Sequence, residues 1–568
     1  MASTQQQPNP GETPAEEISP SSVDGSVETP AKGSSSTTTR TDSNFRNFRN
    51  FLIPGVSGLA AGLVTSLLTV VVMGIMRLVA GIPTPVELFG DYVLKHIDVN
   101  MFMKLLMTFA PTPKTTPLGL ALLGMVAIGT VLGLIYAGLV QVRLPANGNR
   151  PGRREWLIAL VLAELLSLVG IVLFWNELPQ NFLGLPFTWA RVVTALALLI
   201  DFNFYGIVLS RLYRVLLPKE PKAGVAPSVQ GRREWLARAG VAALGVGGLG
   251  AGLGAVSDFL QHYTSYDGMK TAIHNGVTPA ITPNSEHYVV TQNPSDPAVD
   301  ASLWQLEVTG LVGHAGSYSY EALQQLPSTS RAITLECIAN GRGDHLIGTA
   351  VWQGVTLQTL LDRHGGAQPN ASYIALYSTD GYNISLPLNE VLAVDPLFAW
   401  RMNGAELPQR HGFPLRTLIP GRYGEENVKW LTRIELTDHF VGGLYSDQGW
   451  YHGPLHTMSR IDRPFAGQQV QGGKPVEVGG IAFAGNRGIK RVEVSADNGA
   501  TWNVATLQPP ISQDSWVMWS WEWTPFIMGN QTLMARATDG TGAVQTSQVQ
   551  GTVPNGATGY HTIQVKVV

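Results

Sequence analysis

The pattern of hydrophobic and polar positions divides the chain into a tail, an apolar region and a soluble region. Residues 1–50 are mostly Ser, Thr, Pro, Gln and Glu. Such a segment buries too little apolar surface to offset its ordering entropy, so we expect a disordered cytoplasmic tail. Residues 51–257 contain long uncharged runs, and residues 258–281 form a polar linker. From residue 282 onward, short alternating runs between Gly, Asn and Asp turns predict a soluble domain.

The apolar region predicts a bundle of about five transmembrane helices, because a helix of roughly 20 apolar residues crosses a bilayer. The expected spans are 52–76, 118–140, 156–175, 187–209 and a weaker, Gly/Ala-rich run at 235–256. Arg and Lys gather before the first span and in the loops after the second and fourth, which places the N-terminus in the cytoplasm. Five crossings put the rest of the chain on the extracytoplasmic side of a bacterial-type plasma membrane, and an even number would reverse this.

The flank of the fifth span resembles a twin-arginine export signal. It reads Gly-Arg-Arg-Glu-Trp-Leu at 231–236, but the same hexapeptide stands at 152–157 before the third span. Ordinary positive-inside anchoring explains both copies equally well. Whether the fifth span is cleaved stays open.

Two carboxylates, Glu164 and Asp201, lie inside the third and fourth predicted spans. Acids within a membrane are costly and indicate a proton, quinol or cation site. The alternative is a protonated pair that only holds the helices together. None of the five spans contains histidine, which excludes bis-histidine haem ligation within them.

Composition narrows the function classes. Charged residues make up 14% of the chain, against about 25% in soluble domains, which agrees with membrane spans. The net charge of −3 provides no basic field for nucleic acid. The single cysteine, Cys337, excludes intramolecular disulfides and multi-thiolate zinc or iron–sulfur sites.

Cys337 follows a predicted strand at 332–335 and opens a Gly-rich loop that also carries Asn340 and Arg342. A nearby guanidinium lowers a thiol pKa, and the thiolate is both a nucleophile and a soft metal ligand. A plain buried core cysteine is the alternative.

The soluble region contains further recognisable elements. We expect a strand at 304–312, helices at 321–326 and 355–363, a hairpin at 373–388, and strands at 476–483, 489–495 and 532–538. The regular strands after residue 459 predict a C-terminal β-sandwich of immunoglobulin-like size. His411, Arg416 and Lys429 each lie beside a Gly/Pro turn, where such side chains suit an anionic ligand such as a phosphate.

Together these segments resemble the molybdopterin-dependent sulfite oxidase family over about half of the chain. The motifs are LECIANGR at 335–342 for the metal-ligand loop, WQGVTL at 352–357 for the helix that follows, and HGFPLR at 411–416, PG at 420–421 and VKWL at 428–431 for the pterin-phosphate segment. The resemblance implies an α+β molybdopterin domain at 282–458 and an Ig-like dimerisation-type domain at 459–568.

The resemblance also implies roles for individual residues. Cys337 would ligate molybdenum. The cofactor-binding residues would be Cys337, Asn340, Asp380, His411, Arg416 and Lys429. The catalytic residues would be Cys337, Arg342, Trp352 and Tyr451. Two alternatives to these catalytic roles stay open: Trp352 is only a core residue, and Arg342 is only a surface loop charge. The molybdenum–molybdopterin cofactor would perform the oxygen-atom transfer, and no haem is expected in this chain.

Two departures leave the substrate open. The family often places a histidine three residues before the cysteine, where this chain has Thr334, and the expected arginine cluster is not evident beyond Arg342. Sulfite oxidation and sulfoxide reduction are both open, so the expected substrate is a small sulfur-containing compound. The electron partner would be an external cytochrome or a quinol system, and a homodimer through the last domain is open. The alternative is a non-catalytic membrane protein that uses the same fold as a binding or assembly module.

Overall fold

The computed structural model describes residues 38–109, 114–220, 227–263, 268–293 and 296–568. The predicted tail at 1–37 lies outside these residues. Helix α1 begins at Thr38, within the predicted tail, and the tail boundary at residue 50 stays a prediction. The polar stretch before the first span contains neither Gly nor Pro that would end a helix, and the helix therefore extends beyond the apolar run.

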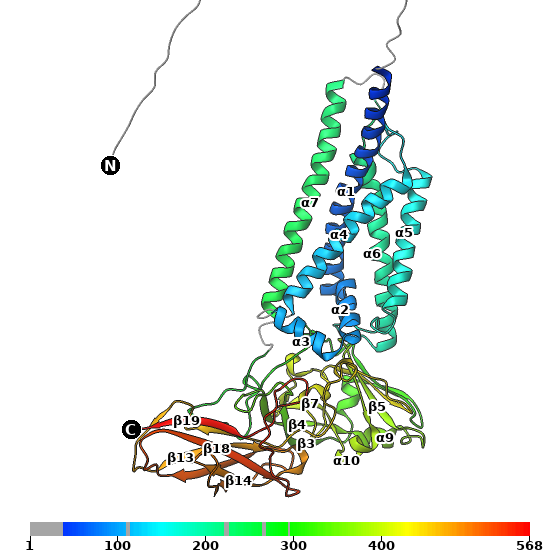
Figure 1. Ribbon diagram of the computed structural model, residues 1–568. Coiled ribbons are helices and arrows are strands. Elements are labelled where there is room, and N and C mark those ends of the chain that lie inside the picture. The colour runs from blue at the N-terminus through cyan, green and yellow to red at the C-terminus, as the bar shows by residue number, and fades with distance from the viewer. Residues whose placement is uncertain (1–37, 110–113, 221–226, 264–267, 294–295) are drawn as a thin grey trace, which may run out of the picture. The chain divides into compact units, whose positions relative to one another are not determined.

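Helices make up the first half of the described chain (Figure 1). They are α1 (Thr38–Ala80), α2 (Pro85–His96), α3 (Val99–Thr108), α4 (Thr115–Val140), α5 (Arg153–Leu173), α6 (Phe187–Leu216) and α7 (Pro227–Tyr263). Among the described residues, four segments are long and apolar enough to cross a membrane: Leu52–Ala80, Thr116–Val140, Arg153–Leu173 and Phe187–Leu216. They correspond to the first four predicted spans. The predicted fifth span falls in α7, which is not among the four, and the orientation that depends on it stays a prediction.

Small residues allow the spanning helices to pack closely. Gly58 and Gly62 of α1 face Gly129 and Gly133 of α4, and a Cβ on Gly58 would lie 2.5 Å from the Gly133 carbonyl oxygen. Within a bilayer, close backbone approach of this kind supplies the packing that the hydrophobic effect supplies in water. Figure 1 likewise shows α5 and α6 running side by side.

Helices α2 and α3 were missed by the sequence analysis because both are short and amphipathic. Each begins at a side-chain cap. The Thr84 hydroxyl accepts from the Glu87 N–H at 3.3 Å, and Asp98 accepts from the N–H groups of Asn100 and Met101. Such caps satisfy backbone donors that would otherwise lack partners at a helix start.

Two sheets form the α+β domain that follows. The first has the order β2-β1-β10-β5-β6, and the second has the order β3-β4-β7-β8 with β9 paired to β7. The strands are β1 (Gln305–Gly310), β2 (Gly316–Ser319), β3 (Thr329–Glu336), β4 (Ile347–Thr356), β5 (Tyr373–Ser378), β6 (Asn383–Pro387), β7 (Leu397–Met402), β8 (Ala405–Glu406), β9 (Arg416–Leu418) and β10 (Leu431–Thr437). The connecting helices are α8 (Tyr320–Gln324), α9 (Leu357–Arg363), α10 (Leu388–Val394) and α11 (Leu444–Asp447). Both sheets contribute to one core: Leu306 and Ile434 from the first, Val355 and Phe398 from the second.

The C-terminal domain consists of two further sheets that share a core. Their orders are β11-β13-β17-β16 and β12-β19-β18-β14-β15, and Figure 1 shows them in orange to red. The strands are β11 (Met458–Arg463), β12 (Gln469–Val470), β13 (Val476–Phe483), β14 (Ile489–Ser495), β15 (Asn503–Val504), β16 (Thr506–Leu507), β17 (Val517–Trp523), β18 (Gly529–Asp539) and β19 (His561–Val567). Val478 and Trp519 of one sheet pack with Val494 and Leu533 of the other.

The segment predicted as a linker at 258–281 belongs instead to its two neighbours in the described residues. Helix α7 continues to Tyr263, and residues from 268 onward belong to the soluble region. The Thr271 N–H donates to the His345 carbonyl at 2.9 Å, and the Thr278 hydroxyl donates to Asp462 at 2.6 Å. The segment is polar because its side chains and backbone pair with the two soluble domains.

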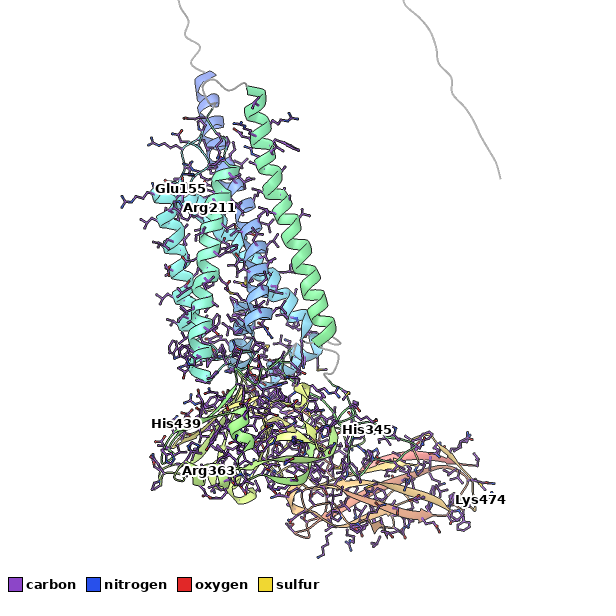
Figure 2. The ribbon with its side chains drawn as sticks, turned by 180° about the vertical axis from the view of Figure 1, so that it is seen from behind. Glu155, Arg211, His345, Arg363, His439 and Lys474 are labelled. Atoms are coloured by element: carbon purple, nitrogen blue, oxygen red, sulfur yellow. The ribbon has the colours of Figure 1, made fainter. Side chains whose placement is uncertain are left out.

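The loops of the helical region bond to the soluble region. The Asn181 side chain donates to the Ala80 carbonyl at 2.9 Å, while its backbone N–H donates to the Thr379 carbonyl at 2.8 Å. The Gln448 side chain donates to the Leu94 carbonyl at 2.8 Å. At the other end of α5 and α6 the basic loops gather, where Figure 2 shows Glu155 and Arg211.

Candidate functional site

A cavity of about 150 Å³, partly open to solvent, lies in the α+β domain. Five of the predicted site residues line it: Cys337, Asp380, His411, Arg416 and Lys429. They come from separate places in the sequence, namely the end of β3, the β5–β6 turn, the loop before β9, the first residue of β9 and the loop before β10. The fold therefore brings the lone thiol and the cationic residues to one site.

The Cys337 loop is fixed by hydrogen bonds at both ends. The Cys337 N–H donates to the Leu346 carbonyl at 2.9 Å. The Asn340 side chain accepts from the Leu346 N–H and donates to Glu336, both at 2.9 Å. Asn340 is buried and does not line the cavity, and its hydrogen bonds stabilise the loop. Its predicted contact with the cofactor stays a prediction.

Basic side chains form one wall of the cavity. Burial lowers the pKa of Arg416 to about 10 and that of Lys429 to about 8, and it lowers the pKa of His411 well below the usual histidine value. Arg410, which the sequence analysis missed, lines the same cavity. Because burial penalises unbalanced positive charge, this wall would gain stability from a bound anion.

Specific contacts hold these basic side chains in place. Arg416 donates through Nη1 to the His411 carbonyl at 3.0 Å, and Lys429 donates to the carbonyls of Val290 and Arg410 at 3.2 and 3.3 Å. The Nε of Arg416 is buried and has no hydrogen-bond partner among the described residues. A buried guanidinium N–H without a partner is costly, which indicates an acceptor that the protein itself does not supply.

His287 and Tyr288 also line the cavity, and the sequence analysis missed both. The His287 ring centre lies 5.4 Å from that of His411. Burial, followed by smaller effects that include the charge of Arg416, lowers the pKa of His287 to about 4. Both histidines are therefore neutral near pH 7. An isolated His-Tyr pair in a polar segment carries no periodic or motif signal that could have identified it.

Asp380 lies in the β5–β6 turn, beneath the cavity. It accepts a hydrogen bond from the Tyr382 N–H at 3.1 Å and another from the Asn293 side-chain amide. Burial raises the pKa of Asp380 above its ordinary value. Glu425, another cavity residue, has a pKa raised well above the usual range by burial and by its neighbour Glu426. The cavity thus combines a cationic wall with carboxyl groups whose pKa values are raised by burial.

Three predicted catalytic residues do not line the cavity. Arg342 is exposed and lies against Gly559 of the C-terminal domain. Tyr451 donates its hydroxyl hydrogen to the Pro454 carbonyl at 2.9 Å. Trp352 is fully buried and donates through its indole N–H to the Ile333 carbonyl at 3.1 Å. The core alternative for Trp352 and the surface alternative for Arg342 agree with these positions.

The residues present fit the cofactor that the family resemblance implies. No group of three or more His, Cys, Asp or Glu side chains gathers in the described ranges in a way that could hold a metal. The Cys337 thiol would thus be a single ligand to a metal carried by its own cofactor. The cavity is partly open to solvent, and the Arg416 Nε offers the unmet donor that a phosphate would satisfy.

Comparisons with known proteins agree with this geometry. Residues 293–445 match the oxidoreductase molybdopterin binding domain, and residues 453–568 match the Mo-co oxidoreductase dimerisation domain. The chain is 28% identical to inducible NADH nitrate reductase 1 of Glycine max, over 47% of this chain and 37% of that protein. It is 30% identical to the NAD(P)H nitrate reductase of Hordeum vulgare, over 46% and 36% respectively.

Among solved structures, the sulfane dehydrogenase SoxCD from Paracoccus pantotrophus matches with a TM-score of 0.47 and 24% identity, over 51% of this chain and 82% of that one. The chain spans little more than a third of the length of the nitrate reductases that it matches. The predicted family is nevertheless confirmed by its two consecutive domains. Residues 293–445 and 453–568 carry the two domains of a molybdopterin-dependent oxidoreductase, a molybdopterin-binding domain followed by a Mo-co dimerisation domain.

Proposed function

We propose that this chain is a membrane-anchored enzyme that transfers an oxygen atom to or from a small sulfur-containing substrate. The observation that carries the proposal is the placement of Cys337 in one cavity with His411, Arg416 and Lys429. When bound, the molybdenum cofactor would supply the two-electron oxygen-atom transfer. The electrons would be exchanged with an external carrier, a cytochrome or a quinol.

The side chains of the cavity would divide the remaining work. Cys337 would ligate the metal through its thiolate. Arg416 and Lys429 would hold the phosphate of the cofactor by charge-assisted hydrogen bonds. The neutral histidines His287 and His411 add hydrogen-bonding capacity without further positive charge. Glu425, whose pKa is raised by burial and by Glu426, also lines the cavity and adds a carboxyl group to it.

Substitution of Cys337 tests this proposal most directly. We expect Cys337→Ser to fold and to lose turnover, with an altered electron paramagnetic resonance spectrum of the molybdenum. Ser330→Ala, at an exposed position of the same strand, should behave as wild type. Full molybdenum-dependent turnover of Cys337→Ser would overturn the assignment.

The substrate class is tested by spectroscopic titration with sulfite, with a sulfoxide and with nitrate. We expect one of the two sulfur compounds to change the molybdenum signal, while a response to nitrate alone would contradict the proposed substrate class. The non-catalytic alternative predicts purified protein without stoichiometric molybdenum, which metal analysis decides.

The anchor is proposed to be a transmembrane bundle with the catalytic domain outside the cytoplasm. The four apolar segments and the basic loops between them support this topology. Because the only cysteine is buried, Lys474→Cys introduces one exposed thiol. A maleimide reagent that cannot cross membranes should label Lys474→Cys in intact cells, and labelling only after lysis would reverse the orientation.

The C-terminal domain is proposed to be an Ig-like sandwich through which the chain forms a homodimer. The match to a dimerisation domain and the two sheets around a shared core support this. Light scattering of the purified protein should give twice the mass of one chain after subtraction of detergent, and the mass of a single chain would contradict the dimer.

A further inference from the structure

A second cavity, of about 100 Å³ and partly open, lies among helices α1, α2 and α4. It shares no lining residue with the Cys337 cavity. Most of its wall is aliphatic or thioether, including Val70, Met73, Leu118, Leu122 and Met125. These residues belong to two of the apolar segments long enough to cross a membrane. The cavity is therefore suited to a molecule that partitions into the bilayer.

One end of this cavity is polar. Arg77, Thr84 and Glu87 line it, and the Arg77 Nε lies 3.0 Å from a Glu87 carboxylate oxygen. The Arg77 guanidinium carbon also lies 3.3 Å from the centre of the Phe182 ring. Burial of an arginine within an apolar helix costs free energy, which favours a functional role for Arg77. A purely hydrocarbon ligand could not form hydrogen bonds with this guanidinium and carboxylate, so the ligand is expected to have a polar group at this end.

The polar end faces the soluble region. Arg77 is three residues from Ala80, whose carbonyl accepts from Asn181, and Asn181 in turn donates to Thr379 next to the Cys337 cavity. An occupant of this second cavity would thus present its polar head toward the cofactor domain.

Polar side chains also lie between the two cavities. Asp91 lies one turn after Glu87 on α2, a rise of about 6 Å. The Gln180 amide donates to Asp91 at 2.9 Å and packs against Gly381, the neighbour of Asp380 in the Cys337 cavity. Burial raises the pKa of Asp91 to about 7, so this carboxyl group can gain and lose a proton near neutral pH.

We propose that the cavity among α1, α2 and α4 binds a membrane quinone, with the ring at the Arg77–Glu87 end and the tail between the apolar walls. The inference rests on the proposed function and names its electron carrier. A quinone takes two electrons from the reduced molybdenum cofactor and two protons to become a quinol, or the quinol returns both when the sulfur substrate is reduced. Arg77 donates to a quinone oxygen, and the two protons enter or leave the ring at the polar end of the cavity, near Asp91.

The test uses the full chain in lipid nanodiscs and decylubiquinone, together with its photoreactive azido derivative. Gly74 lines the cavity, and a Cβ placed there meets no atom within 4 Å, so Gly74→Leu fills the cavity without a backbone clash. Gly138→Leu on α4 is the matched control, since it also meets no atom within 4 Å and lies outside the cavity.

We expect Gly74→Leu to weaken decylubiquinone binding at least tenfold and to remove photolabelling of the α1 and α4 peptides, whereas Gly138→Leu retains both. Equal binding by Gly74→Leu and wild type would overturn the proposal, as would equal loss in both variants. Displacement of the probe by excess phosphatidylglycerol would identify a lipid site instead and would also overturn it.

Molybdenum content and reduction of a soluble dye by the sulfur substrate are measured on the same variants. These two readouts test the proposed function without a quinone. If Gly74→Leu loses quinone binding but keeps molybdenum and dye reduction, the inference is supported. If the wild-type protein contains no molybdenum, the proposed function is contradicted, and the binding measurements alone then show whether the second cavity holds a quinone.

Discussion

The guanidinium carbon of Arg416 lies 4.9 Å from the centre of the Trp352 ring. Trp352 is fully buried on β4, behind the cavity wall, and Arg416 stands between the indole and the cavity. A cation over an indole face is stabilised by the ring quadrupole, most strongly where water is excluded. The tryptophan therefore acts on the site through the arginine that it supports.

Trp352→Ala should destabilise the protein by roughly 3–5 kcal/mol, because it removes a large buried side chain, and it should also lower cofactor content. Denaturant unfolding and molybdenum analysis check this. Trp502→Ala is the control, since Trp502 carries a comparable stack with Arg536, 4.1 Å away, in the C-terminal domain. Its cofactor content should stay at the wild-type level, and a similar loss in both variants would contradict the supporting role.

Lys429 should make anion binding depend on pH. Burial lowers its pKa from 10.5 to about 8, so in the empty site the amine is neutral above pH 8. A bound phosphate restores the charge and takes up a proton, and affinity therefore falls by up to about tenfold per pH unit above 8. Titration of cofactor-free protein with inorganic phosphate measures this slope. Lys429→Met should bind more weakly and show a flatter profile, and an unchanged slope would exclude Lys429 as its source.

His287 should weaken the fold in acid. Its pKa falls from an ordinary value of 6.5 to about 4, so the unfolded chain binds more protons between these values. Stability is complete above pH 6.5 and is lost as pH falls toward 4, by about 3 kcal/mol for a shift of this size. Unfolding free energies across this range should decline less in His287→Gln. The exposed His439 offers a control, and His439→Gln should follow the wild-type curve.

Gly381→Ala should lower the free energy of unfolding by more than left-handed backbone strain alone would. Gly381 has φ +80°, and an added Cβ would lie 2.3 Å from the Gln180 amide nitrogen. The variant combines left-handed strain with displacement of Gln180 from Asp91, which we expect to total roughly 2–4 kcal/mol. Gly366→Ala, with φ +79° and no atom within 4 Å of the Cβ, isolates the backbone contribution. Thermal unfolding compares the two, and equal melting temperatures would mean that the Gln180 contact contributes nothing.

Local sequence was sufficient for the residues whose role is set by a loop. Cys337, His411, Arg416 and Lys429 follow strand ends or turns that the sequence marks clearly, and all four line one cavity. Arg342 and Tyr451 could not be placed in the same way, because the direction of a side chain from a loop depends on the neighbouring domain. Arg342 turns toward Gly559, more than two hundred residues later in the chain.

Hydrophobic runs predicted the four long apolar helices and a minority of the strands, among them β1, β3 and β13, since burial on one face dictates their period. The short helices α2 and α3 escaped because their caps are local hydrogen bonds with weak sequence signals. His287 and Tyr288 escaped because only tertiary folding brings them to His411. The contacts of Gln180 with Asp91 and with Gly381 likewise join residues that are remote in sequence.

The bridge made by Asn181 has a practical consequence for anyone who would trim this protein to a soluble fragment. A truncation that starts after α7 would remove both Gln180 and Asn181, which support the turn holding Thr379 and Asp380. The β5–β6 turn of the Cys337 cavity would then lose these supporting contacts. The fragment would bind cofactor poorly even though it still contains every predicted ligand. The membrane part is thus a structural component of the catalytic domain as well as its tether.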